Sequence, residues 1–291
     1  MSILIIDPRS HDLGGGFTVA RVLPYRRRRM VGPFIFFDRM GPNLLPAPVP
    51  MGQDVRPHPH IGLSTVTYLF EGQMRHRDSL GFDQDILPGD LNWMTAGKGI
   101  SHSERFDGMR EDGGLIDGIQ AWVALPEAHE EDEPSFAHYS RDDLPVFSDS
   151  GLEGRLIAGN AFGLHSPARI HSPLFYIDIS LQSGASITLP EGYPERAVYI
   201  ANGKIEIEDK LYVSGQMLVF DADAAPRIKA SQPSRLMLLG GDPLGERHIW
   251  WNFVSSRKER IEQAKEDWEQ GRIALPPHDN QEFIPLPDGV A

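Results

Sequence analysis

Short runs of β-branched and aromatic residues between turn residues mark the first half of the chain and predict short β-strands. Residues 64–70 are dense in β-branched and aromatic side chains and end at a Glu-Gly pair, which is typical of a strand that runs into a turn. Further strands are predicted at 74–78 and, after a Pro-Gly-Asp turn, at 91–94. Strands this closely spaced predict an antiparallel meander within a sandwich or small barrel.

The pattern changes to a helical period near the end of the chain. Side chains that can face a core recur there at helical intervals: Ile261, Ala264 and Trp268. Ser255 or Ser256 is expected to cap this helix, with Glu259 in capping-box spacing, and Gly271 is a natural stop. We expect tryptophan side chains to pack the helix against a barrel.

Length and composition favour a folded protein with two domains. The chain has 291 residues, of which 40% are hydrophobic and 24% charged. A polar, turn-rich region between residues 126 and 152 suggests a boundary that gives domains at 1–140 and 141–291. Within it, the acidic run 128–134 is interpreted as a solvated connector rather than a docking surface.

Charge and hydropathy restrict the classes of partner. The net charge of −13 argues against direct binding of nucleic acid, because such binding depends on neutralising phosphates, and the four arginines at 26–29 are too few to offset it. No stretch reaches the roughly 18 apolar residues of a membrane span, and the first residues lack a basic leader. A cytoplasmic location is therefore the default expectation.

Two short motifs place metal-ligand side chains at strand spacing. His58 and His60 are two residues apart, as are His102 and Glu104, so each pair points to one face of a strand. If the two strands face each other, three imidazoles and one carboxylate converge. Imidazole suits iron, copper, nickel and zinc, and an added carboxylate with open positions favours non-haem Fe(II) or a neighbouring divalent metal. The alternative interpretation is that the two pairs occur by chance and that their histidines are exposed. A structural zinc site of the cysteine type is excluded because the chain has no cysteine.

The residues around these motifs resemble a known family. The His-x-His motif, the strand that follows it and the Pro-Gly-Asp turn are similar to the cupin fold, and the longer run 88–104 resembles the pirin family. Residues 29–42, 120–126 and 248–253, with the terminal helix, are also similar to pirins. The resemblance implies an all-β protein of two cupin-type β-barrels (a bicupin) with a C-terminal α-helix.

The second half resembles a degenerate copy of the first. Residues 67–72 align with 198–203 at an offset of 131 (198 minus 67). The same offset puts Leu189 where His58 stands and Glu191 where His60 stands, and no His-x-Glu motif follows. We therefore expect an internal duplication in which the second barrel keeps the fold and lacks the metal.

The resemblance also implies a chemistry. Pirins bind one divalent transition metal, so His58, His60, His102 and Glu104 are expected to hold Fe(II), with Ni, Cu, Mn, Co or Zn as alternatives. Several pirins cleave the flavonol quercetin with O2 as quercetin 2,3-dioxygenases, and Glu104 would then be both a ligand and the catalytic base that takes the flavonol proton.

The family leaves a second function open. Other pirins act as non-enzymatic, iron-dependent redox-sensing co-regulators that bind a transcription factor or a metabolic enzyme, so a protein partner is the alternative to a flavonol. One residue departs from the pattern: many cupins and pirins have a glutamate four positions after the second histidine of the motif, where this chain has Ser64. If that carboxylate tunes the site, metal preference or activity can differ here.

Overall fold

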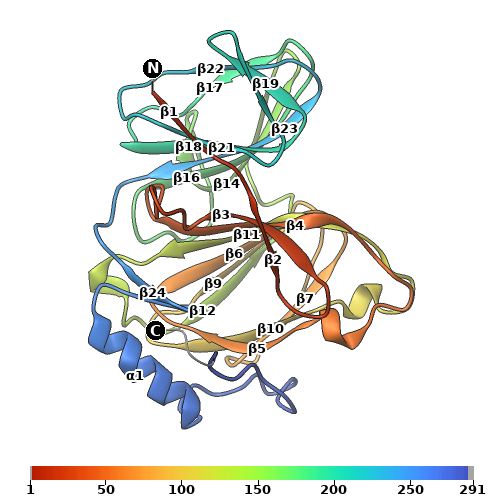
Figure 1. Cartoon of the computed structure of the whole chain (residues 1–291), viewed down its shortest axis with the longest axis vertical. Helices are drawn as coiled ribbons and strands as arrows, with labels where there is room; N and C mark the ends of the chain where they lie inside the picture. The colour runs from red at the N-terminus through yellow and green to blue at the C-terminus, as the bar shows by residue number, and fades with distance from the viewer. Residues whose placement is uncertain (1, 288–291) are drawn as a thin grey trace. The chain divides into compact units, whose positions relative to one another are not determined.

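Antiparallel strands make up almost all of the regular structure. The computed structural model describes residues 2–287 (Figure 1). These residues form two compact units. We call one unit the first barrel; it contains His11–Val19, Arg39–His138 and the residues from Leu244 on. The other, the second barrel, contains the residues up to Ser10, Ala20–Asp38 and Tyr139–Pro243. The expected all-β class with a C-terminal helix is confirmed.

Two sheets contain most of the strand residues of the first barrel. Its seven-stranded sheet has the order β12 (Ser135–Tyr139), β9 (Leu91–Thr95), β6 (Leu63–Glu71), β11 (Gly114–Ala124), β4 (Phe34–Leu45), β3 (Thr18–Leu23) and β2 (Arg9–Asp12). Its four-stranded sheet has the order β5 (Val55–His60), β10 (Ile100–Arg105), β7 (Met74–Asp78) and β8 (Asp83–Ile86). Parts of β2, β3, β4 and β12 fall in the residue ranges of the other unit. Short 3-10 helices connect strands at Met51–Gln53, Asp107–Met109 and Glu127–His129. The strands predicted at 64–70, 74–78 and 91–94 are therefore confirmed as β6, β7 and β9.

The second barrel repeats this arrangement. One sheet has the order β1 (Ile3–Ile6), β21 (Met217–Phe220), β18 (Glu195–Asn202), β23 (Ser234–Gly241), β16 (Leu174–Leu181), β14 (Leu152–Ala161) and β13 (Val146–Asp149), with β15 (Leu164–His165) paired to β14. The other has the order β17 (Ser186–Thr188), β22 (Arg227–Ala230), β19 (Lys204–Ile207) and β20 (Lys210–Val213). The pair β17 and β22 thus takes the place that β5 and β10 have in the first barrel.

Side chains that fill the second barrel are apolar where the first barrel carries histidines. Leu189, which the offset of 131 aligns with His58, is buried in a large cluster of isoleucine, leucine and valine side chains. Glu191, aligned with His60, is exposed. Strand β22 contributes Ile228 and Ala230 to the same cluster. The described part of this interior is therefore a packed hydrocarbon core.

The division into compact units differs from the expected domains at both ends of the chain. The expectation was one cut, giving 1–140 and 141–291. Instead, the residues from Leu244 on cluster with the first barrel, and Ala20–Asp38 cluster with the second. The physical reason is strand pairing and packing between segments far apart in sequence: β1 pairs with β21, and Phe253 packs on Ile61.

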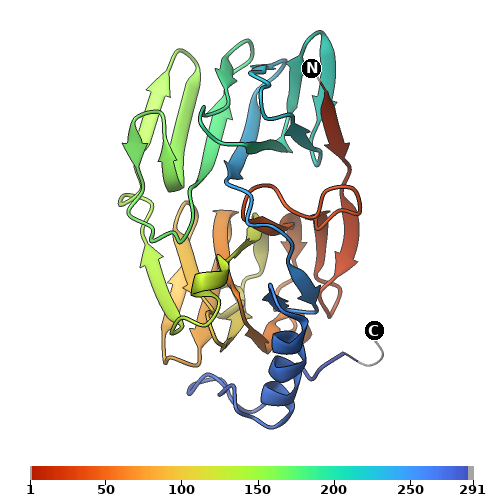
Figure 2. The same cartoon turned by 90° about the vertical axis from the view of Figure 1, so that its left-hand side faces the viewer.

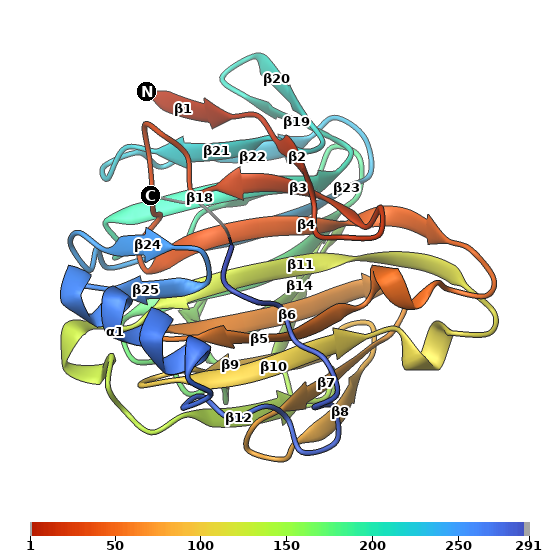
Figure 3. The same cartoon turned by 60° about the horizontal axis from the view of Figure 1, so that its bottom comes forward.

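The terminal helix packs on the first barrel. Helix α1 (Lys258–Glu269) buries Ile261, Ala264 and Trp268, as its period predicted, against Ile61 and Phe253. It lies beside the hairpin of β24 (His248–Trp250) and β25 (Phe253–Ser255), as Figures 2 and 3 both show. The chain then turns away after the helix at Gly271, whose φ is +67°.

The expected serine cap is wrong. The residue that precedes the helix is Arg257, which makes no side-chain cap. The hydroxyl groups of Ser255 and Ser256 instead donate to the Glu130 carboxylate, which also accepts the Ser256 backbone N–H and pairs with Arg247. Glu130 is buried, so the acidic run 128–134 is not simply a solvated connector. Through Glu130, this run holds the segment that leads into α1.

Candidate metal centre

Strands β5 and β10 bring the two ligand motifs together. They lie side by side in Figure 3 and pair antiparallel. In their register, His102 is directly opposite His58. The ladder shifts register between His102 and Glu104, which is a β-bulge of the kind that re-aims side chains near functional sites. The facing of the two strands, on which convergence of the motifs depended, is therefore present in the fold.

The three histidine rings form one compact group. Ring centroids lie 4.5 Å apart for His58 and His102, 5.0 Å for His58 and His60, and 5.1 Å for His60 and His102. One nitrogen of each ring lies within 4.8 Å of the corresponding nitrogens of the other two. All three side chains are buried, and the Trp122 ring of β11 packs edge-on against His60. The alternative of exposed histidines is therefore wrong.

The Nδ1 atom of each ring is occupied by a hydrogen-bond partner. His58 Nδ1 lies 2.9 Å from the carbonyl oxygen of Arg56, and His60 Nδ1 lies 3.2 Å from that of Asn252. His102 Nδ1 lies 3.3 Å from Nδ1 of His76. By contrast, Nε2 of His60 and Nε2 of His102 are buried without a hydrogen-bond partner among the described residues. Buried polar atoms rarely lack a partner, so these two nitrogens are candidate metal donors.

Burial keeps these imidazoles neutral. Desolvation lowers the pKa of His58 to about 4, with a smaller lowering from His76 that opposes the hydrogen bond to Arg56. The pKa values of His60 and His102 are held well below the ordinary range, first by desolvation and then by repulsion from neighbouring histidines. A neutral imidazole offers a lone pair, which is the form that binds a metal.

Glu104 lies on the same strand but is not part of the compact group. Its side chain is buried, and its Oε1 accepts hydrogen bonds from Gln120 Nε2 at 3.1 Å and from Thr67 Oγ1 at 3.4 Å. Desolvation raises the pKa of Glu104 to about 7, and the two hydrogen bonds offset part of that rise. The group of ligand atoms within 4.8 Å of one another contains the three histidines without Glu104.

The residues present fit a divalent transition metal. Neutral imidazole nitrogens, two of them buried and unpartnered, are the donor type that iron, copper, nickel and zinc prefer, and a nearby carboxylate adds charge. Several metals share this donor preference. Which of them is bound depends on the coordination geometry and on the metals available in the cell.

Sequence similarity decides the family. Residues 16–123 match the family model described as Pirin, and residues 176–274 match the Pirin C-terminal cupin domain. A pirin-like protein from Caulobacter vibrioides is 55% identical over 98% of this chain and 99% of its own length. The chain belongs to the pirin family.

Other relatives of this pirin carry names that point to an activity. A Pseudomonas aeruginosa protein, provisionally named as a quercetin 2,3-dioxygenase, is 36% identical over 91% of this chain and 83% of its own. The crystal structure of quercetin 2,3-dioxygenase from Acinetobacter baumannii superposes with a TM-score of 0.89 at 33% identity, covering 99% of this chain and 97% of that one. The two barrels are accordingly cupin-type domains, as the resemblance implied.

Several residues that surround the candidate metal ligands in this pirin were not predicted from the sequence. His76 and Asp78 lie on β7, which was predicted as a strand, but its pairing with β10 was not. The signal available was their spacing of two residues, the same as in the ligand motifs. Gln120 and the Asn252 carbonyl had no comparable signal, because each reaches the site through long-range packing.

Ser64 does not face the ligands. Its hydroxyl lies 3.0 Å from Oγ1 of Thr95, and its side chain is buried. On strand β6 it stands three positions before Thr67, which contacts Glu104, so the two side chains lie on opposite faces of the strand. A carboxylate replacing Ser64 on this backbone would therefore point away from the site.

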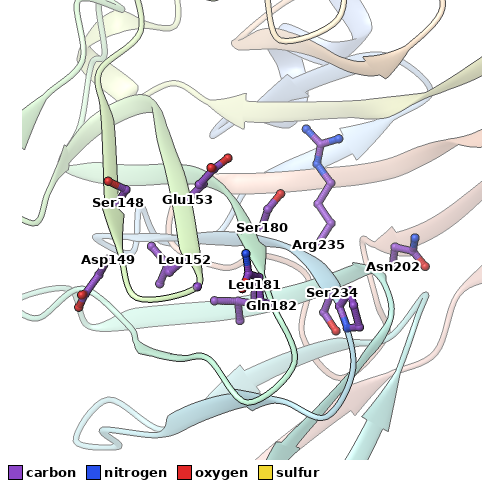
Figure 4. A pocket seen from close by; sticks show the side chains of 12 residues that line it. Ser148, Asp149, Leu152, Glu153, Ser180, Leu181, Gln182, Asn202, Ser234 and Arg235 are labelled. Carbon is purple, nitrogen blue, oxygen red and sulfur yellow. The ribbon is translucent and has the colours of Figure 1, made fainter.

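The second barrel has a surface cavity of a different kind. It encloses about 500 Å³ and is lined by short polar side chains such as Ser148, Ser180 and Ser234 (Figure 4). Arg235 at its edge is paired with Asp178. No group of metal-ligating side chains lies there among the described residues.

No helix in the described part of this pirin has the length and apolar character to cross a membrane.

Proposed function

We propose that this pirin is a metal-dependent dioxygenase that cleaves quercetin-type flavonols with O2. The observation that carries the proposal is the convergence of three neutral, buried imidazoles beside a buried carboxyl group whose pKa is raised to about 7. Relatives and a solved structure that carry the name quercetin 2,3-dioxygenase support it.

In this proposal the metal is held by His58, His60 and His102 through Nε2, and by Glu104. Fe(II) is the first choice, and Ni, Cu, Mn, Co or Zn are the alternatives. The metal would supply a Lewis acid for a flavonol oxygen and the redox capacity that reaction with O2 requires. The Arg56 and Asn252 carbonyl oxygens orient two of the imidazoles by accepting from Nδ1–H.

Glu104 is the proposed base for the flavonol hydroxyl proton. A base is most effective when its pKa lies near the working pH, and burial places the pKa of Glu104 at about 7. The Gln120 amide donates from Nε2 to Oε1 of Glu104, and the Thr67 hydroxyl lies 2.6 Å from Oε1 of that amide and 3.4 Å from Oε1 of Glu104. Thr67 and Gln120 together therefore orient the carboxyl group. The Trp122 ring packs edge-on against His60, so an aromatic side chain would border a flat substrate held next to the imidazoles.

The test uses the whole chain, stripped with a chelator and reloaded without oxygen with Fe(II), Ni, Cu, Mn, Co or Zn in turn. Quercetin is added, followed by air. The expected result is bleaching of the flavonol absorbance with release of one carbon monoxide for each O2 consumed. Metal retention without turnover by any of these metals would contradict the proposal and favour the redox-sensing, partner-binding function.

A pair of matched variants separates the role of Glu104 from a general loss of fold. Glu104→Gln should lose at least 100-fold in turnover, the scale expected for removing a general base. Glu71→Gln makes the same change at the exposed end of β6 and should keep full activity. Equal activity in both variants would exclude Glu104 as the base.

A further inference from the structure

We propose that Asp78 and His76 act as positioning residues that fix the tautomer of His102, so that its Nε2 is left without a hydrogen. This inference rests on the proposed metal site, since it concerns how one of the proposed ligands is prepared. It assigns a role to two buried polar side chains that the chemistry proposed above does not use.

Asp78, His76 and His102 form a chain of hydrogen bonds, which we call the relay. The pairing of β7 with β10 positions these three residues. His102 is directly opposite Asp78 in this ladder, and Glu104 is opposite His76. Asp78 is completely buried, and His76 and His102 are nearly so. The three polar side chains therefore have to satisfy one another, because water does not reach them.

The carboxyl group of Asp78 acts only as an acceptor. Its Oδ1 accepts the backbone N–H groups of Leu80 at 2.9 Å and Phe82 at 3.2 Å. Its Oδ2 lies 2.9 Å from Nε2 of His76. Because Oδ1 is taken up by two donors, Oδ2 is left as the acceptor for the hydrogen bond that His76 donates from Nε2–H in this proposal.

The direction of the next hydrogen bond follows from that proton. In this arrangement His76 carries its one hydrogen on Nε2, so its Nδ1 can only accept. This atom lies 3.3 Å from Nδ1 of His102. Two bare nitrogens would repel at that distance, so His102 must donate from Nδ1–H. Its Nε2 then carries no hydrogen, and it is the buried atom that has no partner among the described residues.

His102 differs from His58 and His60 in the hydrogen-bond partner of its Nδ1 atom. The Nδ1 partners of His58 and His60 are backbone carbonyl oxygens, which no substitution at those positions can turn into donors. The Nδ1 partner of His102 is a side chain, and the ring of His76 is held in place by Phe136, stacked at 4.4 Å. In the relay, therefore, a single substitution can reverse which atoms donate and which accept the hydrogen bonds.

Asp78→Asn is the substitution that reverses it. The side-chain oxygen of the new amide must face the backbone N–H groups of Leu80 and Phe82, which leaves its NH2 group to face Nε2 of His76. His76 then accepts at Nε2 and donates from Nδ1, and His102 is left with its hydrogen on Nε2. That hydrogen competes directly with a metal.

The experiment measures the tautomer and the metal affinity separately. Two-dimensional NMR of ¹⁵N-labelled imidazoles in the chelator-treated protein reports which nitrogen of His102 carries the hydrogen, with the resonance assigned by its loss in His102→Gln. The wild type should show Nδ1–H, and Asp78→Asn should show Nε2–H. Affinity for Co(II), measured by competition with a chelator, should fall about 10- to 100-fold in Asp78→Asn.

Asp83→Asn is the matched control, because it makes the same change of charge on the adjacent strand β8, where the carboxylate pairs with Arg75. It should leave the His102 tautomer and the Co(II) affinity unchanged. A purely structural role for Asp78 would change the melting temperature but leave the tautomer as it is. Nδ1–H on His102 in folded Asp78→Asn, with the affinity of the control, would overturn the relay.

The wild-type spectrum alone keeps the inference testable if Asp78→Asn does not fold. An Nε2–H tautomer of His102 in the metal-free wild type would overturn the relay even if the protein binds metal. An Nδ1–H tautomer in a wild type that fails to bind any metal would support the relay and instead refute the proposed metal-dependent function.

Discussion

The side-chain amide of Gln120 donates from Nε2 to Oε1 of Glu104 over 3.1 Å, which ties strand β11 to the strand that carries two of the proposed ligands. This hydrogen bond lowers the pKa of Glu104 against the larger effect of burial. We expect Gln120→Leu to raise that pKa by about 0.5 to 1 unit, because a hydrogen bond is worth about 1 kcal/mol and one pKa unit about 1.4 kcal/mol. Infrared titration of the carboxyl group in the metal-free protein measures the shift. Gln263→Leu on the exposed face of α1 should leave it unchanged.

Metal affinity should depend on pH through Glu104. Its pKa of about 7 means that protons compete for the carboxylate below neutrality, whereas the pKa of His58 is lowered to about 4. If Glu104 is a ligand, affinity for Ni(II) should fall about tenfold per pH unit between pH 7 and 5. Chelator competition at several pH values measures this slope. The slope should be absent from Glu104→Gln; an equal slope in both proteins would exclude Glu104 as a ligand.

The same carboxyl group should make the metal-free protein less stable as pH rises. The folded protein holds the Glu104 proton more tightly than the unfolded chain does, so this contribution to stability is full below pH 4.5 and is lost as pH rises to about 7. The shift corresponds to up to about 3 kcal/mol. Metal-free Glu104→Gln should therefore exceed the wild type in free energy of unfolding at pH 8, and the difference should shrink towards pH 4.5. Urea unfolding at both pH values tests this, with Glu71→Gln as the exposed control.

The segment after α1 should stabilise the outer side of β10. Asp279 accepts two hydrogen bonds from the Arg105 guanidinium, both of 2.7 Å, and one from the Ser103 hydroxyl at 2.6 Å. Because the Arg105 side chain is buried, Asp279→Asn should lower the free energy of unfolding by about 1 to 3 kcal/mol. The control is Glu282, which also contacts Arg105 but is 44% exposed. Glu282→Gln should change the free energy of unfolding by less than about 0.5 kcal/mol. Equal losses in urea unfolding would contradict this account.

The strands and the ligand motifs were predictable because their signals are local. Strand β6 and strand β7 follow from runs of residues with strand propensity between turn residues. The grouping of His58 with His60 on one face follows from the strand period alone. The offset of 131 between the halves placed β18 correctly, since residues 63–71 map to 194–202 and the strand is Glu195–Asn202.

Other features were predicted wrongly or not at all because they depend on partners far along the chain. The helix cap failed because Ser255 and Ser256 bind the buried Glu130 carboxylate, about 125 residues away, instead of the first turn of α1. The Asn252 carbonyl reaches His60 across 192 residues. Local propensity carries no information on such contacts, because they arise only when hairpins and sheets pack.

The sequence by itself determined the class of the fold, the duplicated order of strands and the residue types that can hold a metal, since these depend on spacing and composition within one strand or turn. Only the tertiary structure decided which nitrogen of each imidazole is free, how far burial shifts the pKa values of Glu104 and the histidines, and that His76 and Asp78 stand behind His102. The reason is that desolvation and hydrogen-bond direction depend on every group packed around a side chain, and strand pairing brings those groups from separate parts of the chain.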